Sequence, residues 1–144
     1  MEILSDSPEE TAAIGKKIAS RLRAGSIIAL EGTLGSGKTY LAKGIALGLG
    51  VTENITSPTY TIINEYSMPL LNAASLYHID AYRLNDDKDF KEIGGLEIMA
   101  GDGICIIEWS DRIAKSLPVD TINISLEITA HSSRLIKIMG LEEL

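Results

Sequence analysis

The segment that constrains the fold most strongly is Gly32-Thr33-Leu34-Gly35-Ser36-Gly37-Lys38-Thr39, which fits the pattern G-x-x-x-x-G-K-[ST]. The glycines in this pattern let backbone N–H groups turn inward and approach phosphate oxygens closely. Residues 26–30, before the loop, form an apolar run typical of a buried parallel strand. After the loop, apolar residues recur at helical spacing until Gly50, a residue type that often ends helices. Because strand, glycine loop and helix follow in the order that the motif requires, the sequence favours a phosphate-binding loop over an ordinary glycine-rich turn with a chance lysine.

Two residues at the end of this loop carry its expected chemistry. Lys38 places an ammonium group where the β- and γ-phosphates of a nucleotide would lie, and Thr39 offers its hydroxyl to Mg²⁺. The loop therefore predicts that a nucleoside triphosphate binds with Mg²⁺. It does not by itself predict hydrolysis, which needs further groups around the metal and the attacking water.

Length and composition bound the class of protein. The 144 residues, 45% of them hydrophobic, suit a single domain over residues 1–144 with its own core. The net charge of −7 argues against a chain that binds nucleic acid without the help of a partner protein. The single cysteine, Cys105, lies in an apolar run, which favours burial and a reducing compartment. With neither a signal-peptide pattern nor an apolar run of membrane-spanning length, the chain is expected to be cytoplasmic.

The rest of the chain predicts an α/β protein. Ser7, Pro8 and Glu10 form a helix start, and Gly25 is expected to end that helix. The other expected elements are a strand over 1–5, antiparallel strands over 59–66 and 74–80, a helix from Asn85 or Asp86 to Glu92, a helical turn over 96–99, a strand over 103–109, a helix capped by Ser110 or Asp111, and a hairpin of 122–128 with 133–139. The expected fold is a P-loop NTPase-like three-layer sandwich, with a mostly parallel central sheet, antiparallel additions and a C-terminal hairpin.

Two acidic residues stand where apolar strands end. Asp80 follows the run 76–79, and Glu108 follows the run 104–107. Ligands of α/β sheets bind at the carboxyl ends of the strands, so both carboxylates are candidates for holding the metal or orienting the attacking water. Either one alone is equally well explained as a solvated acid, but the pair in a chain with this loop favours a functional role.

Several other residues have two interpretations. Ser57-Pro58-Thr59 is either a hydroxyl-rich switch that reaches the γ-phosphate or a turn fixed by its proline. Trp109 is expected on the opposite face from Glu108 if the strand continues, where it stacks on a base, covers a hydrophobic edge or, more commonly, packs in the core. His78 is expected to pack within its strand, and His131 to lie in solvent in the final turn.

Four segments together resemble one family closely. They are residues 32–39, residues 57–61 (Ser-Pro-Thr-Tyr-Thr), residues 77–84 (Tyr-His-Ile-Asp-Ala-Tyr-Arg-Leu) and residues 107–109 (Ile-Glu-Trp). In order and spacing they are similar to the small bacterial ATPases of tRNA threonylcarbamoyladenosine biosynthesis (TsaE, also called YjeE), and the similarity spans essentially the whole chain. Many families share the glycine loop, whereas the other three segments are far more particular to this one.

The resemblance implies an activity that the residues alone do not. The family binds and slowly hydrolyses ATP with Mg²⁺. It acts with two other bacterial proteins, TsaB and TsaD, which carry out threonylcarbamoyl transfer to adenosine 37 of tRNAs reading codons that start with A. The resemblance implies that ATP turnover resets that complex, so that the family member is an accessory ATPase and not the transferase. It is expected to meet tRNA only through the complex and to bind no membrane.

The resemblance also implies roles for single residues. Thr39 and Glu108 hold the metal, and Asp80 lies beside them as a supporting or water-orienting acid. Thr11 matches a position near the adenine, and Arg134 resembles a C-terminal arginine close to the base, here preceded by two serines instead of the usual glycine-containing context. The expected catalytic residues are Lys38, Asp80 and Glu108. The expected nucleotide-binding residues are Thr11, Gly32, Leu34, Gly35, Ser36, Gly37, Lys38, Thr39, Tyr40, Thr59, Trp109 and Arg134.

Two other functions are compatible with the glycine loop. A small-molecule kinase uses the same loop, although 144 residues leave little room for an acceptor-binding domain and a lid. A nucleotide-dependent adaptor with negligible turnover is the second alternative. Transfer of the γ-phosphate to a metabolite would identify the kinase, and phosphate release that stays flat with and without partners would identify the adaptor.

Overall fold

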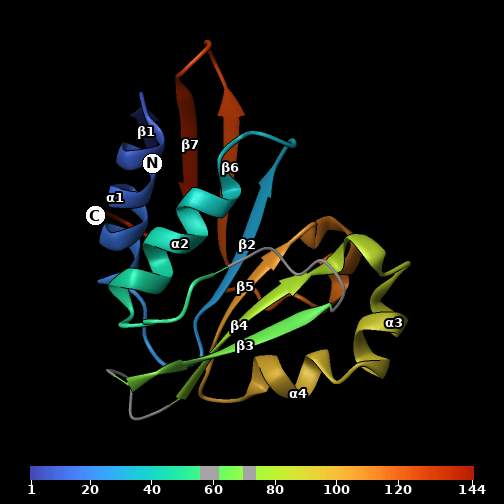
Figure 1. Ribbon diagram of the computed structural model, residues 1–144. Helices are drawn as coiled ribbons and strands as arrows, with labels where there is room; N and C mark the ends of the chain where they lie inside the picture. The colour runs from blue at the N-terminus through green and yellow to red at the C-terminus, as the bar shows by residue number, and fades with distance from the viewer. Residues whose placement is uncertain (56–61, 70–73) are drawn as a thin grey trace.

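The computed structural model describes residues 1–55, 62–69 and 74–144, which form one seven-stranded sheet covered by helices (Figure 1). The strand order is β1-β7-β6-β2-β5-β4-β3. The strands are β1 (Glu2–Ser5), β2 (Ile27–Gly32), β3 (Ile63–Met68), β4 (Ala74–Asp80), β5 (Ile104–Glu108), β6 (Ile122–Ile128) and β7 (Arg134–Met139).

The four central strands of this sheet run parallel. β2 pairs in parallel with both β5 and β6, and β4 pairs in parallel with β5. β7 and β1 extend the sheet antiparallel beyond β6, and β3 pairs antiparallel with β4 at the other edge. The prediction of a mostly parallel sheet with antiparallel additions and a C-terminal hairpin, β6 with β7, is confirmed. The carboxyl ends of β2, β4, β5 and β6 therefore meet at one edge of the sheet.

Helix α1 (Pro8–Ala19) begins as its sequence predicts. Ser7 is the N-cap, and its Oγ accepts a hydrogen bond from the N–H of Glu10 at 3.0 Å. The Glu10 carboxylate reaches back to the N–H of Asp6 at 2.8 Å, one residue earlier than in the usual capping box. The predicted helix end at Gly25 is wrong. That glycine has a φ of +85° and serves the turn into β2, where its lack of a Cβ makes this conformation accessible.

Helix α2 (Lys38–Gly48) packs closely against α1 on one face of the sheet (Figure 1). The two backbones approach each other at glycines. A Cβ on Gly15 would lie 2.6 Å from the carbonyl oxygen of Leu41, and one on Gly44 would overlap the carbonyl group of Ala12. Because only glycine permits this approach, the two helices form a close-packed pair. That pair holds the glycine loop, which leads into α2, in place.

The opposite face of the sheet is covered by short helical segments. They are α3 (Asp87–Glu92), α4 (Gly95–Ala100) and the 3-10 helix η3 (Ser110–Ser116). One hydrophobic cluster lies between the sheet and the helices α1 and α2. Phe90 and Cys105 are buried in a second hydrophobic cluster, which the short helical segments cover. Burial raises the pKa of the Cys105 thiol to about 12, because the charged thiolate would lose its hydration there. Two helical layers around one sheet make the predicted three-layer arrangement.

Two of the predicted elements begin elsewhere than expected. β3 begins at Ile63, and residues 59–61, where the strand was predicted to start, lie outside the described residues. The helical segment after β5 has neither Ser110 nor Asp111 as its cap. It follows Trp109, which has a left-handed φ of 58° and makes no side-chain cap hydrogen bond. For α3, Asp86 is the N-cap, one of the two residues that the sequence offered.

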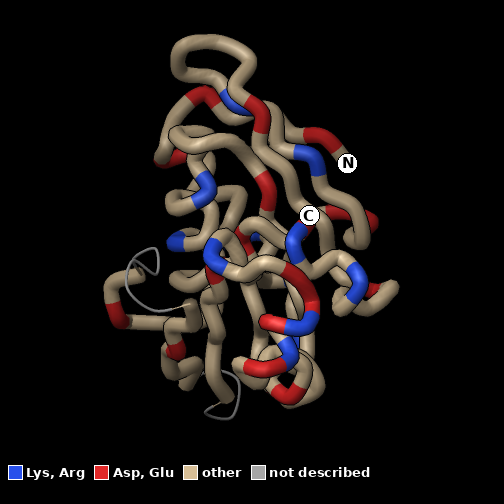
Figure 2. The backbone as a smooth tube through the Cα atoms, turned by 90° about the vertical axis from the view of Figure 1, so that its right-hand side faces the viewer, with Lys and Arg blue, Asp and Glu red and all other residues tan. Residues whose placement is uncertain are grey.

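Charged residues of both signs are spread along the backbone. In the view of Figure 2, Lys and Arg segments alternate with Asp and Glu segments, and no continuous basic stripe crosses the described part of the chain that faces the viewer. The net charge of −7 leaves the chain with an excess of acidic residues, which does not favour direct binding to a polyanion. Among the described helices, none is both long enough and apolar enough to cross a membrane.

Candidate functional site

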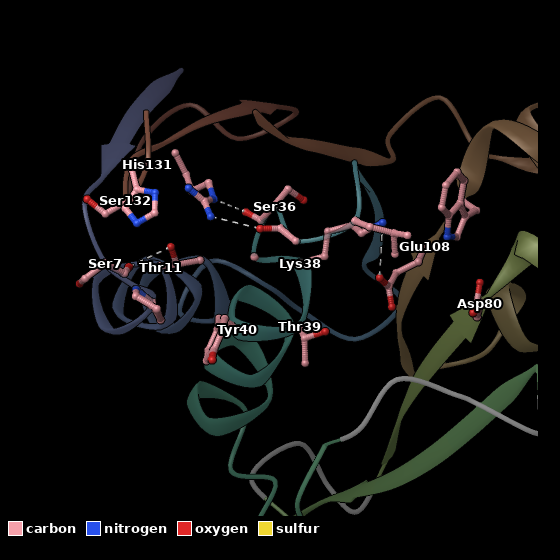
Figure 3. Close-up of a pocket in the computed structure, with 16 residues that line it drawn as sticks. Ser7, Thr11, Ser36, Lys38, Thr39, Tyr40, Asp80, Glu108, His131 and Ser132 are labelled. Carbon is pink, nitrogen blue, oxygen red and sulfur yellow. Dashed lines mark hydrogen bonds and ion pairs between the residues drawn. The ribbon is translucent and has the colours of Figure 1, made fainter. Parts of the chain in front are cut away.

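A cavity of about 520 Å³ lies where the carboxyl ends of the parallel strands meet the glycine loop (Figure 3). This volume is in the range of small-molecule sites, roughly 300–1,000 Å³. Its lining residues are Ser7, Pro8, Thr11, Leu34, Gly35, Ser36, Gly37, Lys38, Thr39, Tyr40, Asp80, Glu108, Trp109, His131, Ser132 and Arg134. The fold thus brings together every described residue that was predicted to bind nucleotide, except Gly32.

The glycine loop has the backbone of an anion cradle. Gly35 and Gly37 have φ values of +79° and +101°, which residues with a Cβ rarely adopt. Apart from Gly35 itself and its two chain neighbours, no described residue has an atom within 4 Å of the place where a Cβ on Gly35 would sit, so the loop is open there. Gly32 has a different task, because a Cβ on it would come within 2.5 Å of the Ser36 hydroxyl. Gly37 is the N-cap of α2 without a side-chain cap hydrogen bond, so no capping side chain occupies the first N–H groups of the helix.

Arg134, the first residue of β7, is bound to the carbonyl side of this loop. Its Nε donates a hydrogen bond to the carbonyl oxygen of Ser36 at 3.1 Å, and its Nη2 donates to that of Gly35 at 3.1 Å. These two hydrogen bonds tie carbonyl groups of the loop to a cationic side chain that lines the same cavity. The structure therefore places Arg134 as a support of the loop. Its expected proximity to the base stays a prediction.

Lys38 lies buried at the centre of the lining residues. Its Nζ is 4.0 Å from Oε1 of Glu108 and 4.7 Å from the centre of the Trp109 ring. A carboxylate and an aromatic face both attract a cation, so they hold the ammonium group at one place. Lys38 is the first residue of α2, at the end of the glycine loop where the sequence predicts that phosphates bind, and it lines the same cavity as the loop.

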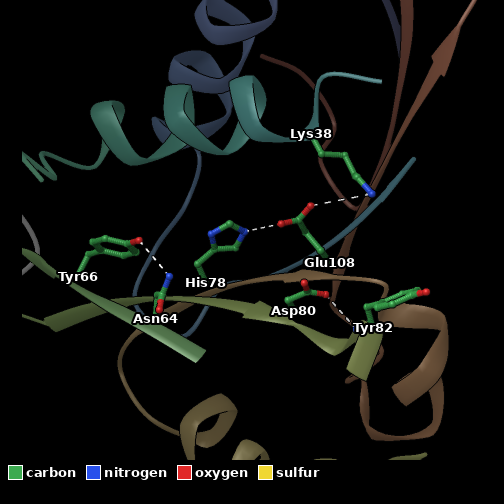
Figure 4. A network of polar contacts seen from close by, with 7 residues as sticks. All are labelled: Lys38, Asn64, Tyr66, His78, Asp80, Tyr82 and Glu108. Atoms are coloured by element: carbon green, nitrogen blue, oxygen red, sulfur yellow. Dashed lines mark hydrogen bonds and ion pairs between the residues drawn. The ribbon is translucent and has the colours of Figure 1, made fainter. Parts of the chain in front are cut away.

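Glu108, the last residue of β5, is held from two sides (Figure 4). One carboxylate oxygen, Oε1, faces Lys38, and the other, Oε2, lies 2.7 Å from Nε2 of His78. The side chains of Glu108 and His78 are only 8% and 1% exposed. The expectation that His78 packs inside its strand is confirmed as far as burial goes. Its hydrogen bond to Glu108 was not predicted, because sequence spacing does not reveal pairing between residues in different strands.

Asp80, at the end of β4, has different surroundings from its neighbour. It is the register partner of Glu108 across the β4–β5 pair, and both line the cavity. Asp80 is half-buried, and its Oδ1 accepts a hydrogen bond from the N–H of Tyr82 at 3.0 Å. It thereby caps the 3-10 turn η2 (Ala81–Arg83). The two strand-end acids lie at the same edge of the sheet, as predicted. Glu108 is buried there, whereas Asp80 remains partly open to solvent.

Trp109 lines the same cavity as Glu108 and does not point away from it. The expectation of opposite faces depended on a continuing strand, but β5 ends at Glu108 and the backbone of Trp109 turns left-handed. The indole ring lies 5.0 Å from the ring of Tyr82 between centroids and also packs against the second hydrophobic cluster. Trp109 therefore contacts both the hydrophobic core and the cavity.

The end of the cavity far from Glu108 is built by segments without a recognisable motif (Figure 3). Thr11 lies there, with its Oγ1 2.7 Å from Oγ of Ser5 and 3.2 Å from the carbonyl oxygen of Ser7. Ser7, His131 and Ser132 also line this end, and the sequence did not single them out as site residues. No spacing signal identifies them, because only the fold brings the β6–β7 turn beside the start of α1.

The donor set of this site suits Mg²⁺. Thr39 and Glu108 line the cavity from α2 and β5. Within the described ranges, no three or more His, Cys, Asp and Glu side chains gather into a metal cluster. Mg²⁺ is commonly held by one or two protein oxygens together with waters and substrate phosphates, so a hydroxyl and a carboxylate beside a phosphate loop fit it. Thr59 lies outside the described residues, so its switch role stays a prediction.

Fold and site together define a class. A sheet with a parallel centre, in which a G-x-x-x-x-G-K-T loop joins β2 to α2 beneath a cavity, is the arrangement of P-loop-type α/β proteins. Within this class, the chain belongs to the TsaE family. The family model described as "Threonylcarbamoyl adenosine biosynthesis protein TsaE" matches residues 5–136.

Individual relatives agree with this assignment over nearly the whole chain. The tRNA threonylcarbamoyladenosine biosynthesis protein TsaE of Treponema pallidum is 44% identical over 138 residues, which cover 96% of this chain and 99% of the relative. The protein of the same name from Bacillus subtilis is 41% identical over 128 residues, or 89% of this chain and 78% of the relative. The crystal structure of Bacillus subtilis YdiB has a TM-score of 0.75 and 36% identity, covering 94% of this chain and 82% of that one.

Proposed function

We propose that this chain is the Mg²⁺-dependent ATP-binding and ATP-hydrolysing subunit of a tRNA threonylcarbamoyl-transfer complex. The family match and the names of the relatives support a role in threonylcarbamoyladenosine biosynthesis. The observation that carries the ATPase part is the meeting of the glycine loop, Lys38 and Glu108 in one cavity. A loop for phosphates, a buried cation and a carboxylate opposite a loop hydroxyl are the parts that phosphoryl chemistry requires.

In this proposal the phosphates of ATP lie on the N–H side of the loop, whose carbonyl side is held by Arg134. Lys38 supplies a positive charge to them from a buried position, where electrostatic attraction is stronger than in water. Thr39 and Glu108 would hold Mg²⁺, which would supply charge neutralisation at the phosphate oxygens. The end of the cavity near Thr11 and His131 is left for the base.

Asp80 is assigned the orientation of the attacking water. It is half-buried in the same cavity, and the N–H of Tyr82 fixes one of its oxygens. An acid beside the metal site that is open to solvent suits this task better than Glu108, which Lys38 and His78 already engage. A positioned side chain of this kind raises the rate by orienting the water or by accepting its proton.

The partners in this proposal are TsaB and TsaD, and the chain reaches tRNA only through them, in the cytoplasm. The net charge of −7 supports indirect contact with tRNA, because direct binding to a polyanion depends largely on basic side chains.

The first test measures phosphate release from ATP by the chain alone and with TsaB and TsaD, with and without Mg²⁺. We expect slow release that requires Mg²⁺ and that Lys38→Ala abolishes. Transfer of labelled γ-phosphate to a metabolite would instead identify a kinase. Release that stays at background in every mixture would identify an adaptor without turnover.

The second test reconstitutes threonylcarbamoylation of tRNA from purified proteins. Modification is expected to need the wild-type chain over multiple rounds and to stop early with Lys38→Ala. Equal modification with and without the chain would contradict its proposed place in the complex.

A further inference from the structure

We propose that His78 is a positioning residue for Glu108, holding its carboxylate in the orientation that accepts Mg²⁺ beside the glycine loop. This inference rests on the proposed function, because it assigns a task to a residue that acts through the proposed metal ligand. It goes beyond that function because neither the glycine loop nor the strand-end acids require a histidine at this place.

Strand geometry brings the two side chains together. His78 and Asp80 are two residues apart in β4, so they lie on the same face of the sheet. Asp80 is the register partner of Glu108, and His78 is the partner of Ile106, two residues earlier in β5. His78 therefore stands one step behind Glu108 on the same face, and its imidazole reaches forward to the carboxylate (Figure 4).

The contact is a short hydrogen bond between two buried side chains. Nε2 of His78 lies 2.7 Å from Oε2 of Glu108, and the two side chains are 1% and 8% exposed. A carboxylate can only accept, so Nε2–H of His78 donates. Nδ1 of His78 is buried and has no hydrogen-bond partner within the described part of the chain. The tautomer with its proton on Nε2 therefore avoids a buried donor without an acceptor.

This hydrogen bond determines where the rest of the carboxylate points. With Oε2 held by His78, Oε1 faces Nζ of Lys38 at 4.0 Å. A carboxylate without this partner would be free to rotate about its last bond, because that torsion is soft. Groups that orient a metal ligand in this way typically change metal affinity or activity roughly 10–100-fold when removed. His78 thus prepares Glu108 before any ligand arrives.

The competing explanation is that His78 only fills space between the sheet and α2. Three substitutions separate the two explanations. His78→Leu keeps an apolar group of similar size and removes the donor. His78→Gln keeps an amide donor near the position of Nε2, and His78→Asn places its amide near Nδ1, where the described structure offers no acceptor. His78→Gln and His78→Asn form a matched pair, because both carry the same amide group on side chains of different length.

The readout is the affinity for a non-hydrolysable ATP analogue with and without Mg²⁺. Trp109 is the only tryptophan and lies beside Lys38, so its fluorescence reports binding without a label. We expect the gain in affinity that Mg²⁺ confers on the wild type to fall roughly tenfold or more in His78→Leu and His78→Asn. His78→Gln should retain most of that gain, and affinity without Mg²⁺ should change little in all three variants.

A mutant cycle with Glu108→Gln separates this proposal from the proposed function. If His78 acts through Glu108, His78→Leu adds no further loss in the Glu108→Gln background. If Glu108→Gln itself leaves the Mg²⁺ gain intact, the metal assignment fails, and the inference about His78 fails with it. If Glu108→Gln loses the gain while His78→Leu keeps it, only the positioning role is overturned.

A measurement on the wild-type chain keeps the proposal falsifiable if a variant does not fold. The chain has two histidines, so nitrogen-15 spectra of its imidazole rings can be assigned with His131→Gln. We expect His78 to carry its proton on Nε2 and to show coupling through a hydrogen bond to a carboxylate. A ring protonated on Nδ1 alone, with no hydrogen bond at Nε2, would overturn the proposal.

Discussion

The carboxyl ends of β4 and β5 lie side by side in the sheet, yet they hold their acidic residues in opposite ways. Glu108 of β5 is 6% exposed, and its two oxygens face His78 and Lys38. Asp80 of β4 is half-buried and accepts a hydrogen bond from the backbone of Tyr82. The two residues are register partners, so their place along the sheet is the same and only their surroundings differ.

A position at the end of a strand makes an acidic residue a candidate for the site, whereas the groups that contact the carboxylate determine what it can do. A buried carboxylate with fixed partners is preorganised, so it needs little rearrangement when charge develops near it. A half-buried carboxylate with a local backbone partner remains in contact with water. We therefore expect substitutions at the two strand ends to have unequal effects.

The largest effect is expected at Lys38, which faces Glu108 and not Asp80. Lys38→Ala removes a buried charge from the phosphate end of the cavity, and loss of one member of a buried charge pair costs binding roughly a hundredfold or more. Calorimetric titration with ATP and Mg²⁺ measures this loss, and Lys38→Arg shows how much depends on charge alone. ATP binding of ordinary strength by Lys38→Ala would refute the phosphate assignment.

The next effect compares the two acids in hydrolysis. Glu108→Gln is expected to lower the rate on the order of a hundredfold and to weaken Mg²⁺-dependent binding. Asp80→Asn is expected to lower kcat roughly tenfold, equal to about 1.4 kcal/mol of barrier, without changing KM, as for a group that acts only after binding. Steady-state phosphate release over a range of ATP and Mg²⁺ concentrations distinguishes the two patterns. Exchange of the patterns between the acids would reverse their assigned roles.

A smaller effect is expected on folding stability. Glu108→Ala leaves buried polar groups of His78 and Lys38 without their partner, at a cost of roughly 1–3 kcal/mol. Asp80→Ala removes the cap of a short exposed turn, which costs about 0.5 kcal/mol. Urea unfolding followed by far-ultraviolet circular dichroism measures both. A larger loss of folding stability in Asp80→Ala than in Glu108→Ala would contradict the expected difference between the two strand ends.

The smallest effect concerns the other face of β5. Cys105 is buried there, and its pKa is raised to about 12, so the thiol stays protonated at pH values where an exposed cysteine would already ionise. We expect no measurable reaction of the native chain with a thiol reagent at mildly alkaline pH, and full reaction in urea. Rapid modification of the native chain would show that β5 is not packed as described, which would weaken any argument from Glu108 on the same strand.

Local patterns predicted much of this fold because they depend on neighbours in sequence. The start of α1 at Ser7 follows from capping chemistry, β4 follows from its β-branched and aromatic residues, and β6 follows from the alternation of apolar and polar side chains. Two predicted helix boundaries were wrong, the end of α1 at Gly25 and the start of the helical segment after β5. At both places a residue with a left-handed backbone, Gly25 or Trp109, lies in the turn that connects two elements. A residue's tertiary surroundings decide such turns more than its type does.

The glycine loop, the order of strand, loop and helix, and the two acids at strand ends can all be read from the amino-acid sequence, because each depends on residues that are close along the chain. Only the tertiary structure decided that Arg134 supports the loop from β7, that His78 binds Glu108, and that His131 joins the start of α1 at the far end of the cavity. These contacts join segments far apart in sequence. Their geometry depends on strand register and helix packing, which local spacing does not contain.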